Sequence, residues 1–77
     1  MSVSVVTPID TSYAVRLDSI DANTTYVGEA PIGANGTESR WRLRKLVQDG
    51  SVLSIFWADG NQSFDNVWDN RASLTYL

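Results

Sequence analysis

The clearest alternation of apolar and polar residues lies in the middle of the chain. Residues 40–47 read RWRLRKLV. This order places Trp41 and Leu43 on one face and the alternating arginines at 40, 42 and 44 on the other. A period of two is typical of a half-buried antiparallel strand. This stretch is therefore predicted to be a strand with a basic outer face.

A second alternating stretch, residues 52–57, follows Asp49-Gly50, and in it Leu53, Ile55 and Trp57 share a face. Asp-Gly between two such stretches predicts a β-hairpin with a type I′ turn, which needs positive φ at both central residues. A helix is the alternative for the first stretch, but it would have to pass Asp49-Gly50 into the β-rich VLSIFW. We expect a central hairpin at about residues 40–58.

Two short strands are predicted before the hairpin. Residues 13–17 alternate, with the odd-numbered side chains inward, and residues 25–30 form the second strand. Within the second strand, Gly28 marks either a bulge or a close approach of the backbone. Turn-forming residues at 18–24 and a glycine-containing loop at 31–38 separate these strands from their neighbours.

After the hairpin, residues 62–70 predict a loop or one helical turn, in which Phe64 and Trp68 have helical spacing. A last strand is expected at residues 72–77. About five short strands with turns between them predict an all-β domain, a small antiparallel five-stranded barrel or sandwich. Residues 1–77 are expected to form one such domain.

The length and composition of the chain exclude several classes of function. A 77-residue domain buries only about 60% of its unfolded surface, so it is marginally stable by itself. The chain has no cysteine and no histidine, which excludes disulfides, thiolate metal sites and the usual base of acyl-transfer enzymes. We expect no cofactor, no enzymatic activity, and stabilisation by oligomerisation or by docking on a larger assembly.

The first ten residues, MSVSVVTPID, have no basic region before their apolar run and make a poor secretory signal. No apolar stretch approaches the roughly 20 residues that span a bilayer, so no membrane partner is expected. Residues 1–10 are a candidate extended arm, in which Val3 and Val5 would contact a neighbouring sheet. A loose terminus is the alternative.

The positive charges are concentrated on one predicted strand face. Arg40, Arg42 and Arg44 form an arginine stripe, whereas the net charge of the chain is −3. Such a stripe can follow phosphates, but the acidic balance argues against nucleic acid and favours a solvated face or a subunit interface. These arginines are candidate partner-interface residues.

The segment after the hairpin carries polar residues two apart: Asp59, Asn61, Ser63 and Asp65. This is the spacing of the first half of an EF-hand loop, but the sixth position lacks glycine and the twelfth lacks glutamate, so a hydrogen-bonded turn is expected in place of a calcium site. A carboxylate pair for glycoside hydrolysis would need a deep cleft, which a chain of this size cannot easily form.

Aromatic residues offer a second candidate surface. Trp57 and Trp68, beside Asp59 and Asn61, would form a platform for a glycan if they were exposed. The alternative is that the tryptophans belong to the core, which we expect of Trp41 and Trp57.

Part of the chain resembles a known group of proteins. It has Tyr-x-Gly-x-Ala-x-x-Gly from Tyr26, then Trp-x-x-x-Lys, then Trp-Ala-Asp-Gly, Phe-Asp, Trp-Asp-x-Arg and Leu-Thr-Tyr. These segments resemble short, mostly uncharacterised proteins encoded among the virion genes of tailed bacteriophages. The matching positions are Tyr26, Gly28, Ala30, Gly33, Trp41, Lys45, Trp57, Ala58, Asp59, Gly60, Phe64, Asp65, Trp68, Asp69, Arg71, Leu74, Thr75 and Tyr76.

The resemblance implies a virion protein made in the host cytoplasm that acts through contacts with other virion proteins, at the tail, baseplate or fibre attachment or as a capsid decoration. A small glycan-binding module of a phage adhesion apparatus, with a host-surface glycan as partner, is the alternative. We further hypothesise that Asp69 and Arg71 lock the loop after Trp57 by charged hydrogen bonds, while Phe64 and Trp68 plug the end of the barrel.

Overall fold

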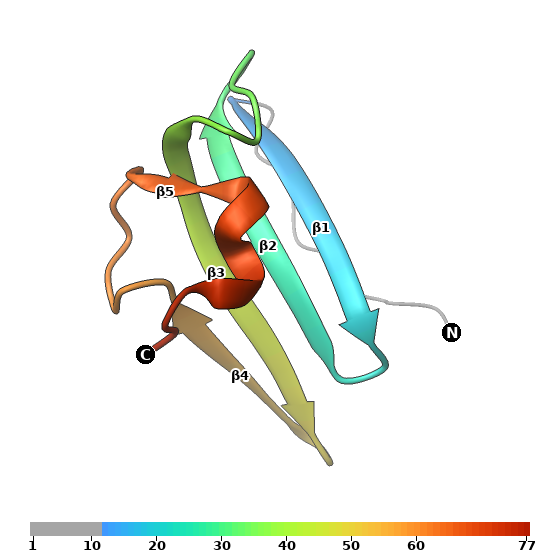
Figure 1. Ribbon diagram of the computed structural model, residues 1–77. Helices are drawn as coiled ribbons and strands as arrows, with labels where there is room; N and C mark the ends of the chain where they lie inside the picture. Colours follow the sequence, from blue (N-terminus) through green and yellow to red (C-terminus); the bar gives the residue numbers. More distant parts are fainter. Residues whose placement is uncertain (1–11) are drawn as a thin grey trace.

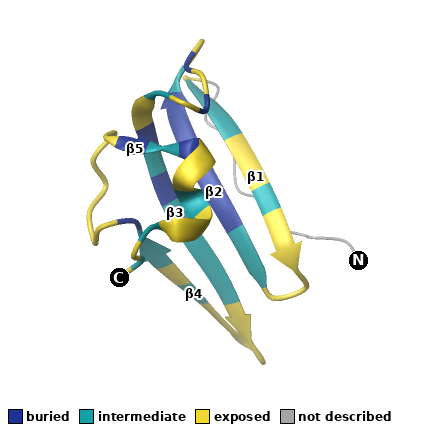
Figure 2. Ribbon diagram, in the orientation of Figure 1, coloured by how far each residue is buried: buried dark blue, intermediate teal, exposed yellow. Residues whose placement is uncertain are grey.

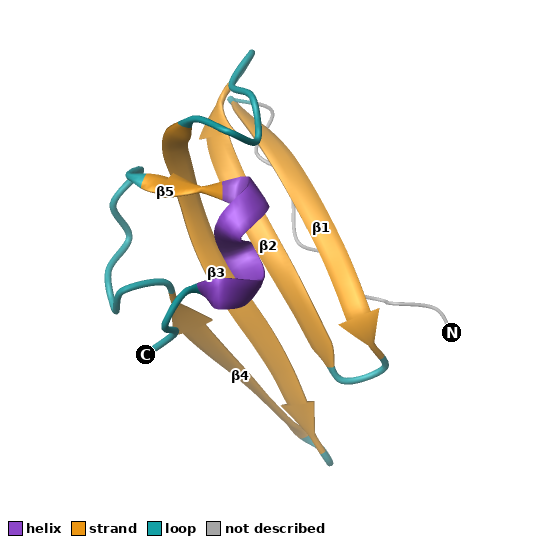
Figure 3. Cartoon of the chain, viewed as in Figure 1, coloured by secondary structure: helices purple, strands orange, loops and turns teal. Residues whose placement is uncertain are grey.

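The computed structural model describes residues 12–77, so the candidate arm with Val3 and Val5 lies outside the described residues. The described part is an antiparallel sheet with one short 3-10 helix lying against it (Figures 1 and 3). Its elements, in chain order, are β1 (Tyr13–Asp21), β2 (Thr24–Pro31), β3 (Ser39–Asp49), β4 (Val52–Trp57), β5 (Asn66–Val67) and η1 (Trp68–Ser73).

The strands form an open meander in the order β1-β2-β3-β4. β3 is long enough to pair with β5 through Ser39 and Trp41 and with β4 from Arg44 onward, both antiparallel. The prediction of an all-β, five-stranded antiparallel fold is confirmed. The sheet does not close into a barrel, because β1 and β4 lie at its opposite ends.

The central hairpin is confirmed, but its turn lies one residue later than predicted. Asp49 pairs with Val52, so Gly50 and Ser51 are the central residues. Only Gly50 has a positive φ (60°), which is the pattern of a type II′ turn, and the predicted type I′ turn is wrong here. β-Pairing extends through Asp49, which leaves only one residue of the Asp-Gly pair for the turn.

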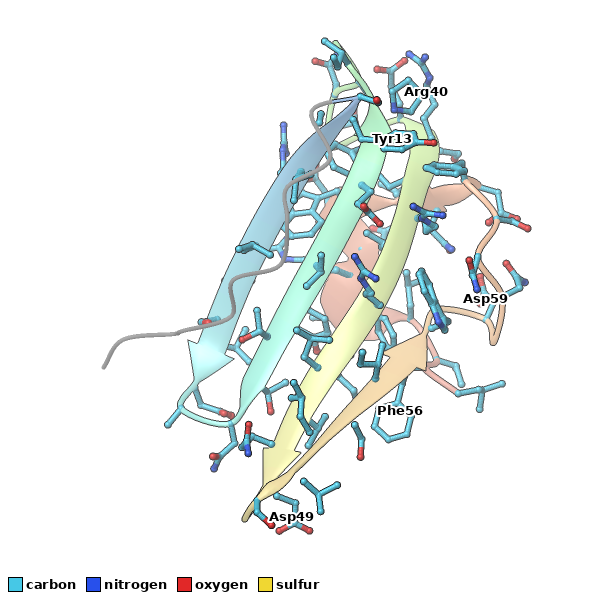
Figure 4. All side chains as sticks on the ribbon, turned by 180° about the vertical axis from the view of Figure 1, so that it is seen from behind. Tyr13, Arg40, Asp49, Phe56 and Asp59 are labelled. Carbon is cyan, nitrogen blue, oxygen red and sulfur yellow. The ribbon has the colours of Figure 1, made fainter. Side chains whose placement is uncertain are left out.

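The prediction for the faces of β1 is also wrong. We call the sheet face covered by η1 the front face and the opposite one, seen in Figure 4, the back face. Ala14 packs against the front-face core, whereas Leu17 is 64% exposed on the back face. The rings of Trp41 and Trp68 fill the space above the front face. Ala14 and the guanidinium of Arg16 fit against them, whereas the bulky apolar side chains of β1 lie on the back face.

The core lies between the front face and the segment that contains η1 (Figure 2). Its buried members are Tyr26, Ala30, Ala34, Trp41, Leu43, Ala58 and Trp68, with Ala14, Leu74 and Tyr76 packed against them. Gly28 lies beneath the aromatic pair, and a Cβ there would be 2.5 Å from Cε3 of Trp68. The close approach predicted at Gly28 is confirmed, and the register runs through it without a bulge.

Three other boundaries differ from the prediction. β1 continues to Asp21, because its later residues pair with the start of β2. Phe64 lies in a loop and not on a helix, and η1 begins at Trp68 with no side-chain cap. Residues 72–73 end η1, and the predicted last strand is reduced to a bridge between Tyr76 and Ala58.

Candidate functional site

The arginine stripe lies on the back face, where its inner members surround one buried carboxylate. Glu29 of β2 is 8% exposed, and its Oε1 lies 3.0 Å from Nη2 of Arg42 and 3.2 Å from Nη2 of Arg44. Glu29 pairs with Arg42 in the register of β2 and β3, which brings these side chains together. A buried carboxylate is stable only when paired, so both arginines neutralise Glu29 from within the chain.

Aromatic rings enclose the same guanidinium groups. Cζ of Arg42 lies 4.6 Å from the ring centroid of Phe64 and 5.7 Å from that of Tyr13, and these two rings stack at 5.5 Å. Cζ of Arg44 lies 5.2 Å from the ring of Trp57. Cation–π contacts of this kind hold the loop that contains Phe64 against the back face.

The outermost arginine is different. Arg40, labelled in Figure 4 at the end of the sheet near Tyr13, has a side chain that is 47% exposed. Its nearest carboxylate, on Glu38, is 3.8 Å away and itself 39% exposed, so this pair contributes little. Of the three arginines predicted to contact a partner, Arg40 alone is largely exposed; Arg42 and Arg44 are mostly occupied by Glu29 and the rings.

The polar residues after β4 form the predicted hydrogen-bonded turn. Asp59 and Gly60 have φ of 59° and 71°, and the amide of Asn61 donates to the carbonyl of Ala58 at 3.4 Å. Positive φ at both central residues is the pattern of a type I′ turn. The turn type that was predicted for Asp49-Gly50 therefore occurs at Asp59-Gly60. Asn61 Oδ1 then accepts a hydrogen bond from the amide of Ser63 at 3.0 Å. Among residues 12–77, no group of acidic side chains is placed to hold a metal ion.

Trp57 and Trp68 do not share a surface. Trp68 is 6% exposed and packs at 5.7 Å from Trp41 beneath η1, on the front-face side of the sheet. Trp57 lies on the back face and is half-buried under Arg44. Asp59 and Asp65 are exposed, and the side-chain Nδ2 of Asn66 donates to Asp65 Oδ1 at 3.4 Å. The two-tryptophan platform of the glycan interpretation is therefore not assembled.

A charged lock does hold the C-terminal segment, with a different carboxylate from the one we hypothesised. Nε of Arg71 donates to Asp18 Oδ2 at 2.9 Å, and its Nη1 donates to the carbonyl of Trp68 at 3.2 Å. The guanidinium also covers the ring of Trp68, with Cζ 4.4 Å from the centroid. Asp69 contributes through its backbone amide, which donates to the carbonyl of Gly36 at 3.0 Å. The lock thus joins η1 to β1.

Tyr76 is the other fixed point of this segment. Its hydroxyl donates to the carbonyl of Arg71 at 2.8 Å, and its ring lies 5.6 Å from that of Tyr26. The pKa of Tyr76 is raised to about 12, mainly by burial and to a smaller extent by the neighbouring Tyr26 and Asp59, while Arg71 acts in the opposite direction. The phenol is therefore neutral over the whole ordinary pH range.

Sequence reasoning missed two acidic residues that hold these arrangements, Glu29 and Asp18. A signal existed for Glu29, because it is the one acidic residue in a short apolar strand and its face follows from the pairing of β2 with the basic β3. No local signal marks Asp18, whose partner Arg71 lies 53 residues away.

Comparisons with protein-family models, with curated protein sequences and with solved structures find no match to this chain. Within residues 12–77, the single helix is far too short to cross a bilayer.

Proposed function

We propose that this protein is a non-enzymatic structural component of a tailed-phage virion, present in many copies and acting through protein–protein contacts. Its location would be the virion, after synthesis in the host cytoplasm. The proposal begins from the resemblance between residues 26–76 and short proteins encoded among phage virion genes.

The placement of the matching residues supports a structural role. Gly28, Trp41 and Trp68 form the contact between the sheet and η1, and Ala30 and Ala58 complete the buried layer around them. Arg71 and Tyr76 fasten the C-terminal segment to that layer. The shared pattern therefore specifies how a small sheet packs, which is what related structural subunits need in common.

The observation that carries the proposal is the apolar surface left outside this core. Leu17, Leu53 and Ile55 on the back face are 64%, 45% and 53% exposed, and β1 and β4 are terminal strands of an open sheet. The outer side of β1 is not paired by any strand within residues 12–77. Exposed apolar side chains on a sheet with such an edge are typical of a subunit that associates with other chains.

The test is the composition of virus particles. We expect gradient-purified particles of a phage that carries this gene to contain the chain in many copies, measured by quantitative mass spectrometry against the major capsid protein. An abundant host protein of similar size serves as the control for carry-over. Recovery of the chain from the lysate but not from the particles would overturn the proposal.

A further inference from the structure

β1 is the longest terminal strand of the sheet, and its outer side is not paired by any strand within residues 12–77. It runs for nine residues without proline or glycine, and Leu17 near its centre is 64% exposed. Natural proteins protect such edges with proline, lysine or a covering segment, because a free edge can pair with another chain. β1 contains neither proline nor lysine, and no strand within residues 12–77 covers its outer side. Its pairing with β2 is regular until the irregularity between Ser19 and Asp21, so residues 13–19 form an edge suited to pairing.

The charges on β1 are arranged for pairing with a copy of itself. Arg16 and Asp18 flank Leu17 and share the front face, because side chains alternate along a strand. If two β1 strands pair antiparallel about a two-fold axis at Leu17, each Arg16 lies directly opposite Asp18 of the second copy. The two leucines then meet on the back face. Opposite charges and apolar pairs placed directly across neighbouring strands are stabilising.

The neighbouring symmetric registers are unfavourable. An axis at Arg16 places two arginines opposite each other, and an axis at Asp18 does the same with two carboxylates; like charges directly opposite are destabilising. An axis at Val15 places Arg16 opposite Ala14 and leaves the charges unpaired. Registers shifted by a single residue are excluded as well. Such a shift would place the front face of one copy beside the back face of the other. The register centred on Leu17 is thus the one that the sequence of β1 selects.

Neither charged side chain is engaged so that it excludes this contact, although Arg16 would have to turn from the ring of Trp41 toward the outer edge of β1. Arg16 is exposed, has no ion pair with any residue of the described range 12–77, and rests with Cζ 5.0 Å from the ring of Trp41. Asp18 uses Oδ2 to bind Arg71, which leaves Oδ1 to accept a second donor. Pairing of β1 would therefore add to the lock between Asp18 and Arg71 without breaking it.

We propose that two copies of this chain associate through β1, antiparallel and centred on Leu17, to give one continuous sheet across the dimer. This inference deepens the proposed function and rests on it, since it names the contact through which the subunit first assembles. The back faces of the two copies then form one uninterrupted surface, on which the exposed Ile55 and Leu53 of each copy remain available for further contacts.

Cysteine cross-linking tests the register directly, because the chain contains no cysteine. In Leu17→Cys the two Cα atoms would lie about 4.5–5.5 Å apart, within the range of about 4.4–6.8 Å that a disulfide spans. We expect a disulfide-linked dimer under mild oxidation, resolved by non-reducing electrophoresis. Ser19→Cys is the matched control on the same strand and face, since its two copies would be four residues out of register, about 13 Å apart. Equal cross-linking of both variants, or of neither, would overturn the proposal.

Charge variants test the same contact without oxidation. Leu17→Lys places two ammonium groups at the axis and should raise the Kd of the dimer at least tenfold, as measured by light scattering over a concentration series. An equimolar mixture of Leu17→Lys with Leu17→Glu should recover the dimer mass. Ile55→Lys, at a similarly exposed position on β4, should leave the dimer intact.

Circular dichroism establishes that each variant is folded. A dimer that survives Leu17→Lys but not Ile55→Lys would place the contact on β4 and refute pairing through β1.

The outcomes separate this inference from the proposed function. A wild-type chain that stays monomeric, together with Leu17→Cys that does not cross-link, refutes pairing through β1. The presence of the chain in virus particles is decided by their composition, which does not depend on that result.

Discussion

Single residues decide how closely the C-terminal segment approaches the sheet. Gly28 lies against the ring of Trp68, Arg71 also contacts that ring, and Asp18 holds the guanidinium in place. The packing of this one indole therefore depends on a missing side chain on β2 and on an ion pair between η1 and β1.

Gly28→Ala tests the close contact between β2 and the ring of Trp68. The added Cβ would meet Cε3 of Trp68 at 2.5 Å and Cε3 of Trp41 at 3.0 Å, and two large buried rings cannot move aside freely. Overpacking of this kind costs about 1–3 kcal/mol, which urea unfolding would measure. Gly36→Ala is the milder comparison, because its Cβ would meet the ends of the flexible side chains of Asp69 and Arg16 and would approach the indole only at Cδ1 of Trp68, 3.3 Å away. Equal losses in the two variants would show that the close contact of residue 28 with the rings is not the reason.

Two aspartate variants test which carboxylate binds Arg71. Asp18→Ala removes the acceptor of Arg71 and should lower the free energy of unfolding by about 1 kcal/mol, since the partly exposed pair is screened by water. Asp69→Ala should have a smaller effect, because the hydrogen bond of Asp69 to Gly36 comes from its backbone amide. Thermal unfolding of the two variants decides the matter; the reverse ranking would restore the lock hypothesised from the sequence.

At the scale of elements, the chain contains two Asp-Gly pairs with different structures. At the end of β3, Asp49 belongs to the strand and only Gly50 adopts a positive φ. After β4, both Asp59 and Gly60 adopt positive φ, and the turn returns the chain toward β5. The conformation of the pair depends on how far strand pairing extends, which the dipeptide itself does not determine.

The turn at Asp59 gives a prediction that separates the effect of backbone conformation from that of the carboxylate. Asp59→Asn should leave stability nearly unchanged, because asparagine adopts positive φ readily. Asp59→Val should cost about 1–2 kcal/mol, the strain of a left-handed conformation for an ordinary side chain. Chemical denaturation of both variants provides the measurement. Equal destabilisation by Asn and Val would mean that the carboxylate, and not the positive φ of residue 59, stabilises this turn.

At the scale of the whole molecule, stability depends on a thin core. One face of the sheet is covered by a 3-10 helix of six residues and the chain after it, while the back face is held by the charged and aromatic cluster around Glu29. Tyr76 connects the helix, β2 and the end of β4. Loss of this one connection affects every layer of the fold.

Alkaline titration tests that connection. Burial raises the pKa of Tyr76 from 10.0 to about 12, so the folded state favours the protonated phenol. The resulting stability is fully present below pH 10.0 and is lost as the pH rises toward about 12, because the unfolded chain releases its proton first. Tyr76→Phe should be less stable at neutral pH, since it lacks the hydroxyl, and should lose less stability between these pH values. Parallel curves for the two proteins in urea unfolding would contradict this assignment.

The sequence predicted the parts of the fold that depend on local patterns. The alternation around Trp41 and the second run ending at Trp57 gave the correct hairpin, and Gly28 marked a real close approach. The prediction exchanged the inner and outer faces of β1. Alternation shows that a strand has two faces, but it does not show which face packs against the tryptophan rings of the core. The partner of Arg42 lies opposite it on the neighbouring β2, so the register of the two strands is needed to identify it. The partner of Arg71 lies on β1, 53 residues away, and only the topology reveals it.

The position of Trp68 has a consequence for the order in which the molecule folds. A nascent chain that has emerged only as far as β4 can form the meander, yet the indole of Trp41 and the backbone around Gly28 have nothing above them. The contacts that cover them join residues far apart in the sequence, and such contacts form slowly. During this interval the front face is exposed to other nascent copies, so productive folding competes with aggregation until η1 docks.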